Sequence, residues 1–406
     1  MKIGELIRYE PFGERFEETT ARFLKARFGG DWKVRWSPGR VGTVPGAQQW
    51  LVNYEINSVF HPTARANVFD VVRREFSSSP VRWKRPLQRM YFGASVSKVF
   101  APGMAHARVD ISPAVPDPQK WLIVPGTHKV RYIDTEERRV YCHLKHGSRM
   151  DRFAKEIEAR RSASGAGVAV PGIVGELGEE CVIEEMVVGT PLNRLSDAKL
   201  QQDCVLQAKS SMQPLYDATV CQEQQSEYAK RLSGEIAAAV AGTRIVASLR
   251  DTILSAVENI QDCLQDPSVV QTVQSHGDFQ PANILWDGQR VWIIDWEYSG
   301  RRQRDYDALV YALQSRFARG IAARTRVYLK GIATRERAEA VARIRCFLLE
   351  EFAFRCEELT AATHEVIAPT FLELLEEAEE MLVVLSEEEN AGKSKVSVFQ
   401  TNGAVS

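Results

Sequence analysis

The sequence predicts an α+β fold, with an antiparallel sheet in the first half of the chain and mainly helices in the second. Two observations lead to this prediction. Between residues 119 and 189, short apolar runs alternate with turn residues, which is typical of antiparallel strands. After residue 195, long stretches carry apolar residues at helical spacing, which indicates packed helices.

The chain has 406 residues, which is too long for one compact core. We expect four parts: an N-terminal extension of unknown role at 1–115, a sheet-rich lobe at 116–188, a helical lobe at 189–386, and a disordered tail at 387–406. The extension is interrupted by Pro, Gly and Trp and could form a small α+β module of its own. The tail has no sustained pattern.

Five strands and one helix are expected in the sheet-rich lobe. The strands are KWLIVPG, KVRYID, RRVYCHLK, GIVGEL and EECVIEEMVVG, and the helix between the third and fourth is SRMDRFAKEIEARR. In the helical lobe, the runs NILW and VWIID are separated by Asp287 and Gly288, a strong hairpin signal. Amphipathic helices are expected before this hairpin and after it.

The formal net charge is −1, so no overall field draws the chain to nucleic acid or to a membrane. Basic residues do gather between 61 and 100, which is most simply a solvated face. Seven cysteines are scattered singly, which argues against a disulfide framework or structural zinc. The charged start is not a signal peptide, and no apolar run is long enough to span a membrane. We therefore expect a cytoplasmic protein.

Residues 276–295 concentrate polar groups in one pattern. His-Gly-Asp at 276–278 is followed five residues later by Asn283, and Asp295 ends the apolar run VWIID. The hairpin between the two runs would bring Asp295 back beside Asn283. A Gly-Asp pair alone is an ordinary turn, but the whole combination is far more specific.

This pattern suits phosphoryl transfer. Such a reaction needs Mg²⁺ against nucleotide phosphates, a carboxylate for the acceptor hydroxyl, and cations on the phosphate oxygens. Mg²⁺ prefers carboxylate, amide and phosphate oxygens. The spacing would let Asp278 point at an acceptor while Asn283 and Asp295 reach a metal.

HGDFQPANIL followed by IIDWEYSG resembles the aminoglycoside phosphotransferase and choline kinase family. That family has a two-lobed protein-kinase-like fold, with a small antiparallel-sheet N-lobe and a mainly helical C-lobe. The resemblance implies that Asp278 is the catalytic base, that Asn283 and Asp295 are metal ligands, and that His276 supports the catalytic loop. It covers about 119–315 and does not explain the N-terminal extension.

The segment DYDAL resembles the Asp-rich segment that follows in the family. Asp307 is the better match for a residue that stabilises the catalytic loop, and Asp305 is a close competitor.

A kinase-like site also needs a strand lysine on the phosphates, held by a carboxylate on the next helix. Lys145 ends the run RRVYCHLK immediately before a helix, and so has the expected position. Glu156 and Glu158 flank the apolar face of that helix on opposite sides, so periodicity leaves the partner open. The family resemblance favours Glu156.

The resemblance also assigns nucleotide contacts. The turn PGTHKVR would cover the phosphates through Gly126 and Thr127, although an ordinary hairpin turn fits these residues equally well. The segment EEMVVG falls at the family's interlobe hinge, where Glu185 and Val187 would offer backbone groups to an adenine.

Together these inferences predict an Mg²⁺-dependent small-molecule kinase that uses ATP or GTP. The acceptor would be an amino alcohol such as choline, an aminoglycoside or a sugar. Trp296 and Tyr298 could face a quaternary ammonium group, or they could pack in the core. One alternative is a protein kinase, which HGD in place of HRD makes less attractive. The other is a non-catalytic scaffold that binds an anionic partner through the basic 61–100 region.

Overall fold

The computed structural model describes residues 2–39, 44–76, 83–243, 245–361 and 369–401. The chain divides into two compact units, and the hairpin segment groups with the first of them. The first unit comprises 1–212 and 281–295, and the second comprises 213–280 and 296–406. The α+β class expected from the sequence is confirmed, but the division lies later in the chain than the expected boundary between 188 and 189.

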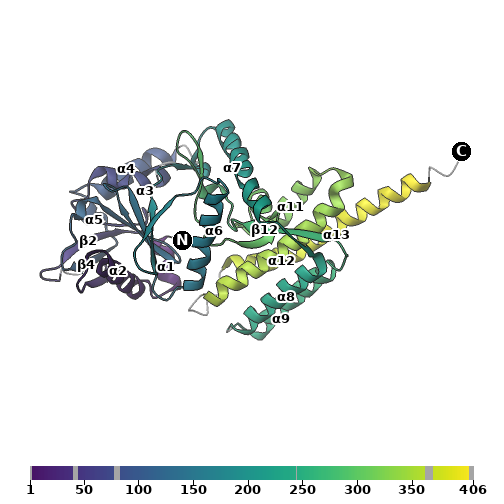
Figure 1. Cartoon of the computed structure of the whole chain (residues 1–406), viewed down its shortest axis with the longest axis horizontal. Coiled ribbons are helices and arrows are strands. Elements are labelled where there is room, and N and C mark those ends of the chain that lie inside the picture. Colours follow the sequence, from purple (N-terminus) through teal and green to yellow (C-terminus); the bar gives the residue numbers. More distant parts are fainter. Residues whose placement is uncertain (1, 40–43, 77–82, 244, 362–368, 402–406) are drawn as a thin grey trace. The chain divides into compact units, whose positions relative to one another are not determined.

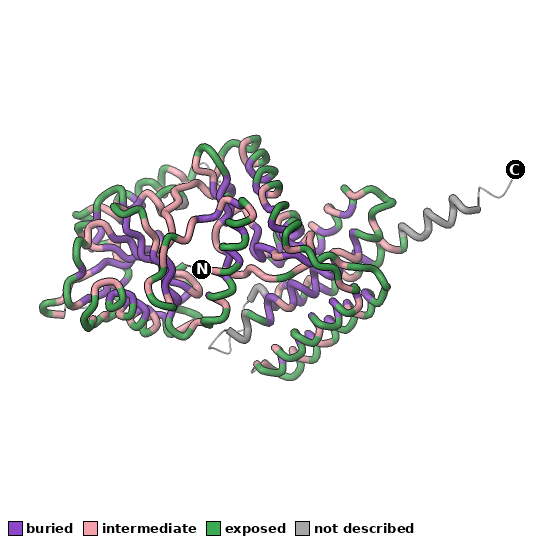
Figure 2. The backbone as a smooth tube through the Cα atoms, in the orientation of Figure 1, coloured by how far each residue is buried: buried purple, intermediate pink, exposed green. Residues whose placement is uncertain are grey.

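One antiparallel sheet of nine strands dominates the first unit, in the order β1-β4-β2-β3-β5-β6-β7-β9-β8. Its strands are β1 (Lys33–Pro38), β2 (Gln48–Asn53), β3 (Ser58–Phe60), β4 (Ala107–Ser112), β5 (Trp121–Pro125), β6 (Lys129–Asp134), β7 (Arg139–Leu144), β8 (Ile173–Glu176) and β9 (Cys181–Glu185). The five strands predicted between 119 and 189 correspond to β5–β9. Figure 2 shows the buried residues of this unit concentrated on the strands.

Helices cover both faces of this sheet, because the strands carry apolar residues on both sides. On one face, α1 (Ile3–Tyr9) and α2 (Phe12–Phe28) pack against alternate residues such as Trp50, Val52 and Tyr132. On the other face, α3 (Asp70–Phe76), α4 (Lys84–Val96) and α5 (Ala101–Met104) pack against Leu51 and Ile133. Figure 1 shows α2 on one side of the strands and α3–α5 on the other.

The first 115 residues are therefore not a module of their own. They supply β1–β4 to the same sheet, and β3 pairs with β5 through Val59 and Ile123. The expectation of a separate module failed because the sequence shows short strands but not their partners, and pairing across about 60 residues is invisible to a local pattern.

The helix predicted after the third strand of the lobe is α6 (Met150–Gly165), which packs on the same face as α3–α5. The predicted hairpin consists of β13 (Ile284–Trp286) and β14 (Val291–Ile293), and β10 (Thr190–Pro191) pairs with β13 on the other side. The short helices η3 (Leu192–Arg194) and η4 (Pro281–Asn283) flank this small sheet. Helix α7 (Ala198–Thr219) runs across the division between the two units.

The second unit is mainly helical and has one apolar core. Its helices are α8 (Gln225–Ala241), α9 (Ala247–Asp262), α10 (Tyr306–Leu313), α11 (Ile321–Lys330), α12 (Arg337–Ala361) and α13 (Pro369–Thr401). A three-stranded sheet of β11 (Cys221–Gln224), β12 (Val269–Ser275) and β15 (Gly300–Gln303) borders the core. The segment that carries His276 and Asp278 leaves from the end of β12.

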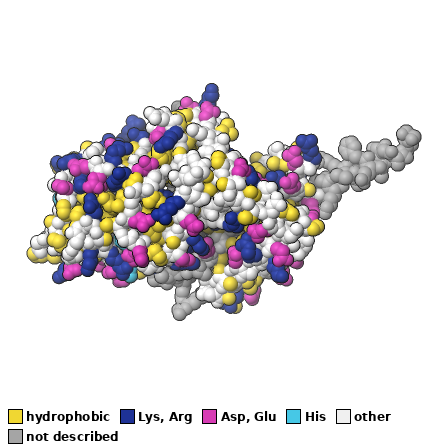
Figure 3. Space-filling model, viewed as in Figure 1, with side chains coloured by type: hydrophobic (Ala, Val, Ile, Leu, Met, Phe, Trp, Pro, Cys, Tyr) yellow, Lys and Arg dark blue, Asp and Glu magenta, His cyan; other side chains and the backbone are white. Residues whose placement is uncertain are grey.

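Helix α13 extends through much of the segment expected to be a disordered tail. It reaches Thr401, and 402–406 lie outside the described residues. Glu387, Glu388 and Glu389 are good helix formers, and Glu388 and Glu389 also form ion pairs with Arg337 and Arg345 of α12, so the helix continues into this segment. Within the described ranges, no helix is long and apolar enough to cross a membrane. Charged side chains of both signs are interspersed on the face that Figure 3 shows.

Candidate functional site

A buried ion pair joins the sheet of the first unit to α6. Lys129 on β6 places Nζ 2.6 Å from Oε1 of Glu156, and both side chains are buried. Lys129 pairs in register with Leu144 of β7, which packs against α6. Glu158 is exposed on the same helix. Of the two glutamates that the sequence left open, the structure therefore buries Glu156.

Lys145 does not pair with Glu156, contrary to the prediction from the sequence. Its Nζ lies 2.6 Å from Oε1 of Glu10 and donates to the Gly126 carbonyl at 3.2 Å. The physical reason is strand alternation, since successive side chains point to opposite faces of a sheet. Leu144 points toward α6, and Lys145 therefore falls on the face that α1 and α2 cover.

Glu10 is thus a residue that sequence reasoning missed. It lies between α1 and α2, and its second oxygen is 2.7 Å from Arg15 Nη1. One carboxylate therefore holds a cation of its own segment and the buried Lys145. No local pattern in the sequence indicated that Lys145 would be buried, or that its partner would lie 135 residues away.

The predicted phosphate-covering turn connects β5 to β6. The backbone N–H of Gly126 donates to the Lys129 carbonyl at 2.8 Å, and a Cβ at Gly126 would lie 3.1 Å from that oxygen. Thr127 is partly exposed at the tip. Burial, with the nearby charges of Arg152, Lys145 and Lys129, lowers the pKa of His128 to about 3, so its imidazole is neutral at physiological pH.

Asn283 and Asp295 lie at the open end of the β13–β14 hairpin. Ile284 pairs with Ile293, and the next N–H, of Ile294, donates to the Asn283 carbonyl at 3.0 Å. The hairpin thus brings Asn283 beside the residue that precedes Asp295, as the sequence suggested. Asp295 has a φ of 65°, a left-handed conformation that is uncommon for a residue with a Cβ and concentrates at functional sites.

Two cations of β6 face Asp295. Its Oδ1 lies 2.9 Å from Arg131 Nη2 and 3.6 Å from Lys129 Nζ. Lys129 and Arg131 are two residues apart on one strand, so they share the face that looks toward α6. Sequence reasoning passed over both, although a Lys-x-Arg directly after the turn was a usable signal.

The donor set of this region fits Mg²⁺ bound together with phosphates. Asp295 and Asn283 supply a carboxylate and an amide, which are hard oxygen ligands. No group of three or more His, Cys, Asp or Glu in the described part of the chain could hold a metal. A cation held by Asp295 and Asn283 would therefore need phosphate or water oxygens to complete its shell, and Lys129 and Arg131 would balance the phosphate charge.

The predicted hinge begins with Glu185, the last residue of β9. The N–H of Glu185 donates to the Gly172 carbonyl at 2.9 Å, and its Oε1 accepts from the Gly172 N–H at 3.0 Å. An adenine contact at Glu185 would therefore have to use its carbonyl oxygen. Val187 lies in the irregular backbone between β9 and β10. Gly189 follows it, where a Cβ would lie 2.8 Å from Leu285 Cβ.

Asp278 belongs to the second unit and is held by two side chains there. Its Oδ1 lies 2.7 Å from Arg316 Nε, and its Oδ2 accepts from Gln280 Nε2 at 2.9 Å. Arg316 is partly buried and also binds Glu351 at 2.9 Å. Burial alone would lower the pKa of the Arg316 guanidinium, but Glu351, Tyr306 and Asp278 outweigh it and raise that pKa above its usual value. Sequence reasoning had no signal for Arg316.

The backbone before Asp278 is fixed by Asp307. Its carboxylate accepts from the N–H groups of His276 at 2.7 Å and of Gly277 at 3.0 Å. Asp305 instead binds Arg343 at 3.0 Å, so Asp307 is the residue that contacts the loop. His276 is buried, and its Nδ1 accepts from the Asp278 N–H at 3.2 Å.

Gly277 could not be another residue in this conformation. Its φ is 84°, and a Cβ would lie 1.9 Å from the Tyr298 carbonyl oxygen. The close approach packs the loop against the segment after Asp295. In that segment, Trp296 is fully buried with its ring 4.8 Å from that of His276. Trp296 therefore packs in the core, the second of the two alternatives considered for it.

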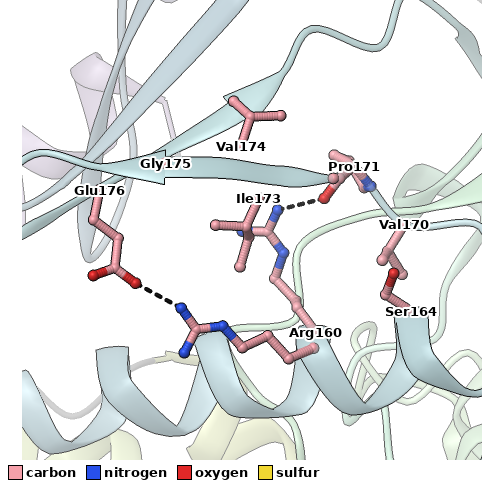
Figure 4. Close-up of a pocket in the computed structure, with 10 residues that line it drawn as sticks. Arg160, Ser164, Val170, Pro171, Ile173, Val174, Gly175 and Glu176 are labelled. Carbon is pink, nitrogen blue, oxygen red and sulfur yellow. Dashed lines mark hydrogen bonds and ion pairs between the residues drawn. The ribbon is translucent and has the colours of Figure 1, made fainter.

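A separate cavity of about 530 Å³ lies between α6 and β8 (Figure 4). Arg160 donates to the Pro171 carbonyl at 2.8 Å on one side of it, and Arg161 binds Glu176 at 2.6 Å on the other. None of the residues predicted for the site lines this cavity.

Comparison with known proteins identifies the family. The model of the phosphotransferase enzyme family matches residues 125–341, which include the candidate residues of the first unit from Gly126 onward and those of the second. No curated protein matches the chain.

Among solved structures, a choline/ethanolamine kinase family protein from Mesorhizobium loti has 15% identity and a TM-score of 0.45, covering 75% of this chain and 99% of that one. A choline kinase from Cryptosporidium parvum has 13% identity and a TM-score of 0.43, covering 69% and 92%. A thermostable mutant of aminoglycoside phosphotransferase APH(4)-Ia has 14% identity and a TM-score of 0.46, covering 66% and 94%.

The family model spans more than half of the chain. The chain belongs to the phosphotransferase enzyme family.

Proposed function

We propose that this protein transfers the γ-phosphate of ATP, or of GTP, to a hydroxyl group of a small molecule in an Mg²⁺-dependent reaction. The acceptor class is an amino alcohol such as choline, an aminoglycoside or a sugar. Membership of the phosphotransferase family supports the reaction type. The observation that carries the nucleotide assignment is the buried pair of Lys129 and Glu156, with Asp295 3.6 Å from the same ammonium.

In this proposal, Lys129 and Arg131 bind the nucleotide phosphates, and Glu156 keeps Lys129 extended toward them. Asp295 and Asn283 hold the magnesium ion. Bound Mg²⁺ would neutralise charge on the phosphate oxygens. The turn at Gly126 and Thr127 covers the phosphates, and the hinge at Glu185 and Val187 contacts the base. Lys145, which the sequence assigned to the phosphates, has a structural role instead.

Asp278 accepts the proton of the acceptor hydroxyl. Arg316 and Gln280 fix the two oxygens of its carboxylate, which orients the base before the acceptor binds. Asp307 and His276 keep the loop backbone in place. A positioned carboxylate of this kind contributes about 10²- to 10⁴-fold to the rate.

The test is to mix the purified chain with ATP or GTP, Mg²⁺ and a panel of amino alcohols, aminoglycosides and sugars, and to follow ADP or GDP release. Asp278→Asn should lower turnover about 10²- to 10⁴-fold and leave nucleotide affinity unchanged. Asp295→Ala should remove the Mg²⁺-dependent stabilisation by nucleotide.

Asp305→Asn is a matched control, because Asp305 also pairs with an arginine of the second unit, at 3.0 Å, but does not contact the loop. It should behave as the wild type. A wild-type chain without Mg²⁺-dependent nucleotide binding, or an Asp278→Asn variant with full turnover, would contradict the proposal.

A further inference from the structure

Exposed apolar side chains gather on α4 and at the start of α5. Leu87 and Met90 lie on one face of α4, one turn from Trp83 at its N-terminal end, while Phe92 points to the sheet and is buried. Val99 and Phe100 extend the exposed set toward α5. The exposed fractions are 67% for Trp83, 52% for Leu87, 69% for Met90, 78% for Val99 and 63% for Phe100. We name these five residues the α4–α5 patch.

Apolar side chains as exposed as these mark an interaction surface when they are contiguous and bordered by polar groups. Single exposed residues elsewhere in the chain need no such explanation. Here three of the five share one helix face and the other two follow within ten residues. The patch therefore differs from scattered surface residues.

The border of the patch is basic. Lys84, Arg89 and Lys98 are exposed, and Arg85 is partly exposed. No Asp or Glu occurs anywhere between residues 76 and 109, in a chain with 53 acidic residues among 406. The net charge of the whole chain is only −1, so this positive field is local to the segment.

We propose that the α4–α5 patch binds the surface of a membrane that contains anionic lipid. Apolar side chains with Lys and Arg beside them on an amphipathic helix are typical of helices that lie in a membrane interface. Trp and Phe favour the headgroup level of that interface, and each basic residue near the surface adds attraction to anionic headgroups. The proposal does not depend on the assigned reaction.

Charge and side-chain chemistry together favour a lipid surface over other anionic partners. Single-stranded nucleic acid is bound by cations and stacking aromatic rings, and the aliphatic Leu87, Met90 and Val99 would add nothing to such a site. An exposed apolar helix face needs no complementary pocket on a fluid bilayer, whereas a protein partner would have to supply one. A protein partner is the alternative, and the experiment below distinguishes it from a lipid surface.

The test is co-sedimentation of the full chain with vesicles of phosphatidylcholine containing about 30% phosphatidylserine, and with vesicles of phosphatidylcholine alone. We expect binding to the anionic vesicles that falls as salt is raised. Leu87→Asn with Met90→Asn should weaken it at least tenfold, and Lys84→Gln with Arg89→Gln should weaken it about tenfold, since each basic residue contributes to headgroup attraction.

Leu206→Asn with Val327→Asn is the matched control, because these side chains are also exposed, at 66% and 71%, but belong to α7 and α11. This control should bind as the wild type does, and all variants should keep the wild-type melting temperature because the changes are on the surface.

Absence of wild-type binding, equal binding to both vesicle types, or unchanged binding by the patch variants would overturn the proposal. So would a change in oligomeric state by the Leu87 and Met90 variant without a change in vesicle affinity, since the patch would then be a protein interface.

Discussion

Replacing Lys129 by Met should weaken ATP binding, whereas the same replacement at Lys145 should not. Lys129 Nζ lies 2.6 Å from Glu156 and 3.6 Å from Asp295, while Lys145 is held by Glu10 on the other face of the sheet. A hydrogen bond to a charged group contributes roughly 1.5–3 kcal/mol, and each 1.4 kcal/mol is about tenfold in affinity. Loss of the Lys129 contact should therefore weaken ATP binding about 10- to 100-fold.

Both variants should lose stability, because each removes one partner of a buried ion pair, which costs about 3–5 kcal/mol. Stability thus cannot distinguish the two lysines, and ligand affinity can. The assay is calorimetric titration with ATP and with adenosine, which has no phosphates and should bind to both variants as to the wild type. If the Lys129→Met variant does not fold, Lys129→Arg, which keeps the charge, can be tested in its place.

Loss of ATP affinity in Lys145→Met together with retention in Lys129→Met would refute the reasoning. It would mean that Lys145 binds phosphate despite its position among α1, α2 and the sheet. Equal affinity of ATP and adenosine for the wild type would remove the basis of the comparison, because no phosphate contact would then exist to lose.

Three further outcomes follow from single residues. Gly277→Ala places a Cβ 1.9 Å from the Tyr298 carbonyl oxygen at a φ of 84°. The strained conformation alone should lower the free energy of unfolding by about 1–3 kcal/mol, so we expect a melting temperature lower by several degrees and turnover at least tenfold lower. A variant with the wild-type melting temperature and turnover would contradict the close approach. Burial raises the pKa of Glu350 from 4.5 to about 7, so the folded chain keeps a proton that the unfolded chain has lost. As the pH rises from about 4.5 to 7, the free energy of unfolding should therefore fall by on the order of 3 kcal/mol in the wild type but not in Glu350→Gln, as measured by urea titration. Parallel pH curves for the two proteins would contradict this prediction. Glu10→Gln should lower the free energy of unfolding by about 3 kcal/mol in the same titrations, because it leaves the buried Lys145 without its carboxylate partner. An unchanged urea midpoint would show that this ion pair does not stabilise the fold.

Local pattern was sufficient for much of the site. The hairpin that brings Asn283 toward Asp295 follows from two short apolar runs around Asp287 and Gly288, since turn chemistry and strand pairing act over a few residues. The contact of Asp307 with the loop before Asp278 matches the order of residues in the family motif. Chemistry that is encoded within about 30 residues was thus readable from the chain alone.

Local pattern alone could not identify which lysine binds the nucleotide phosphates in the proposed function. Lys129 begins β6 and Lys145 directly follows β7, both near the turn that connects β5 to β6, and each is a plausible phosphate ligand. The choice depends on which face of the sheet each side chain meets, and therefore on α6 covering one face and α1 with α2 covering the other. A shift of one residue along a strand reverses the face, and no local signal fixes that.

The sequence by itself determined the α+β class, the catalytic-loop motif with Asp278, and the hairpin that carries Asn283 and Asp295, because short-range spacing and side-chain chemistry specify these features. Only the tertiary structure decided that β1–β4 join the same sheet, that Glu156 pairs with Lys129, and that Arg316 holds Asp278. Each of these contacts joins residues more than 25 positions apart. Such contacts form when the whole core packs, and their partners cannot be read from either segment alone.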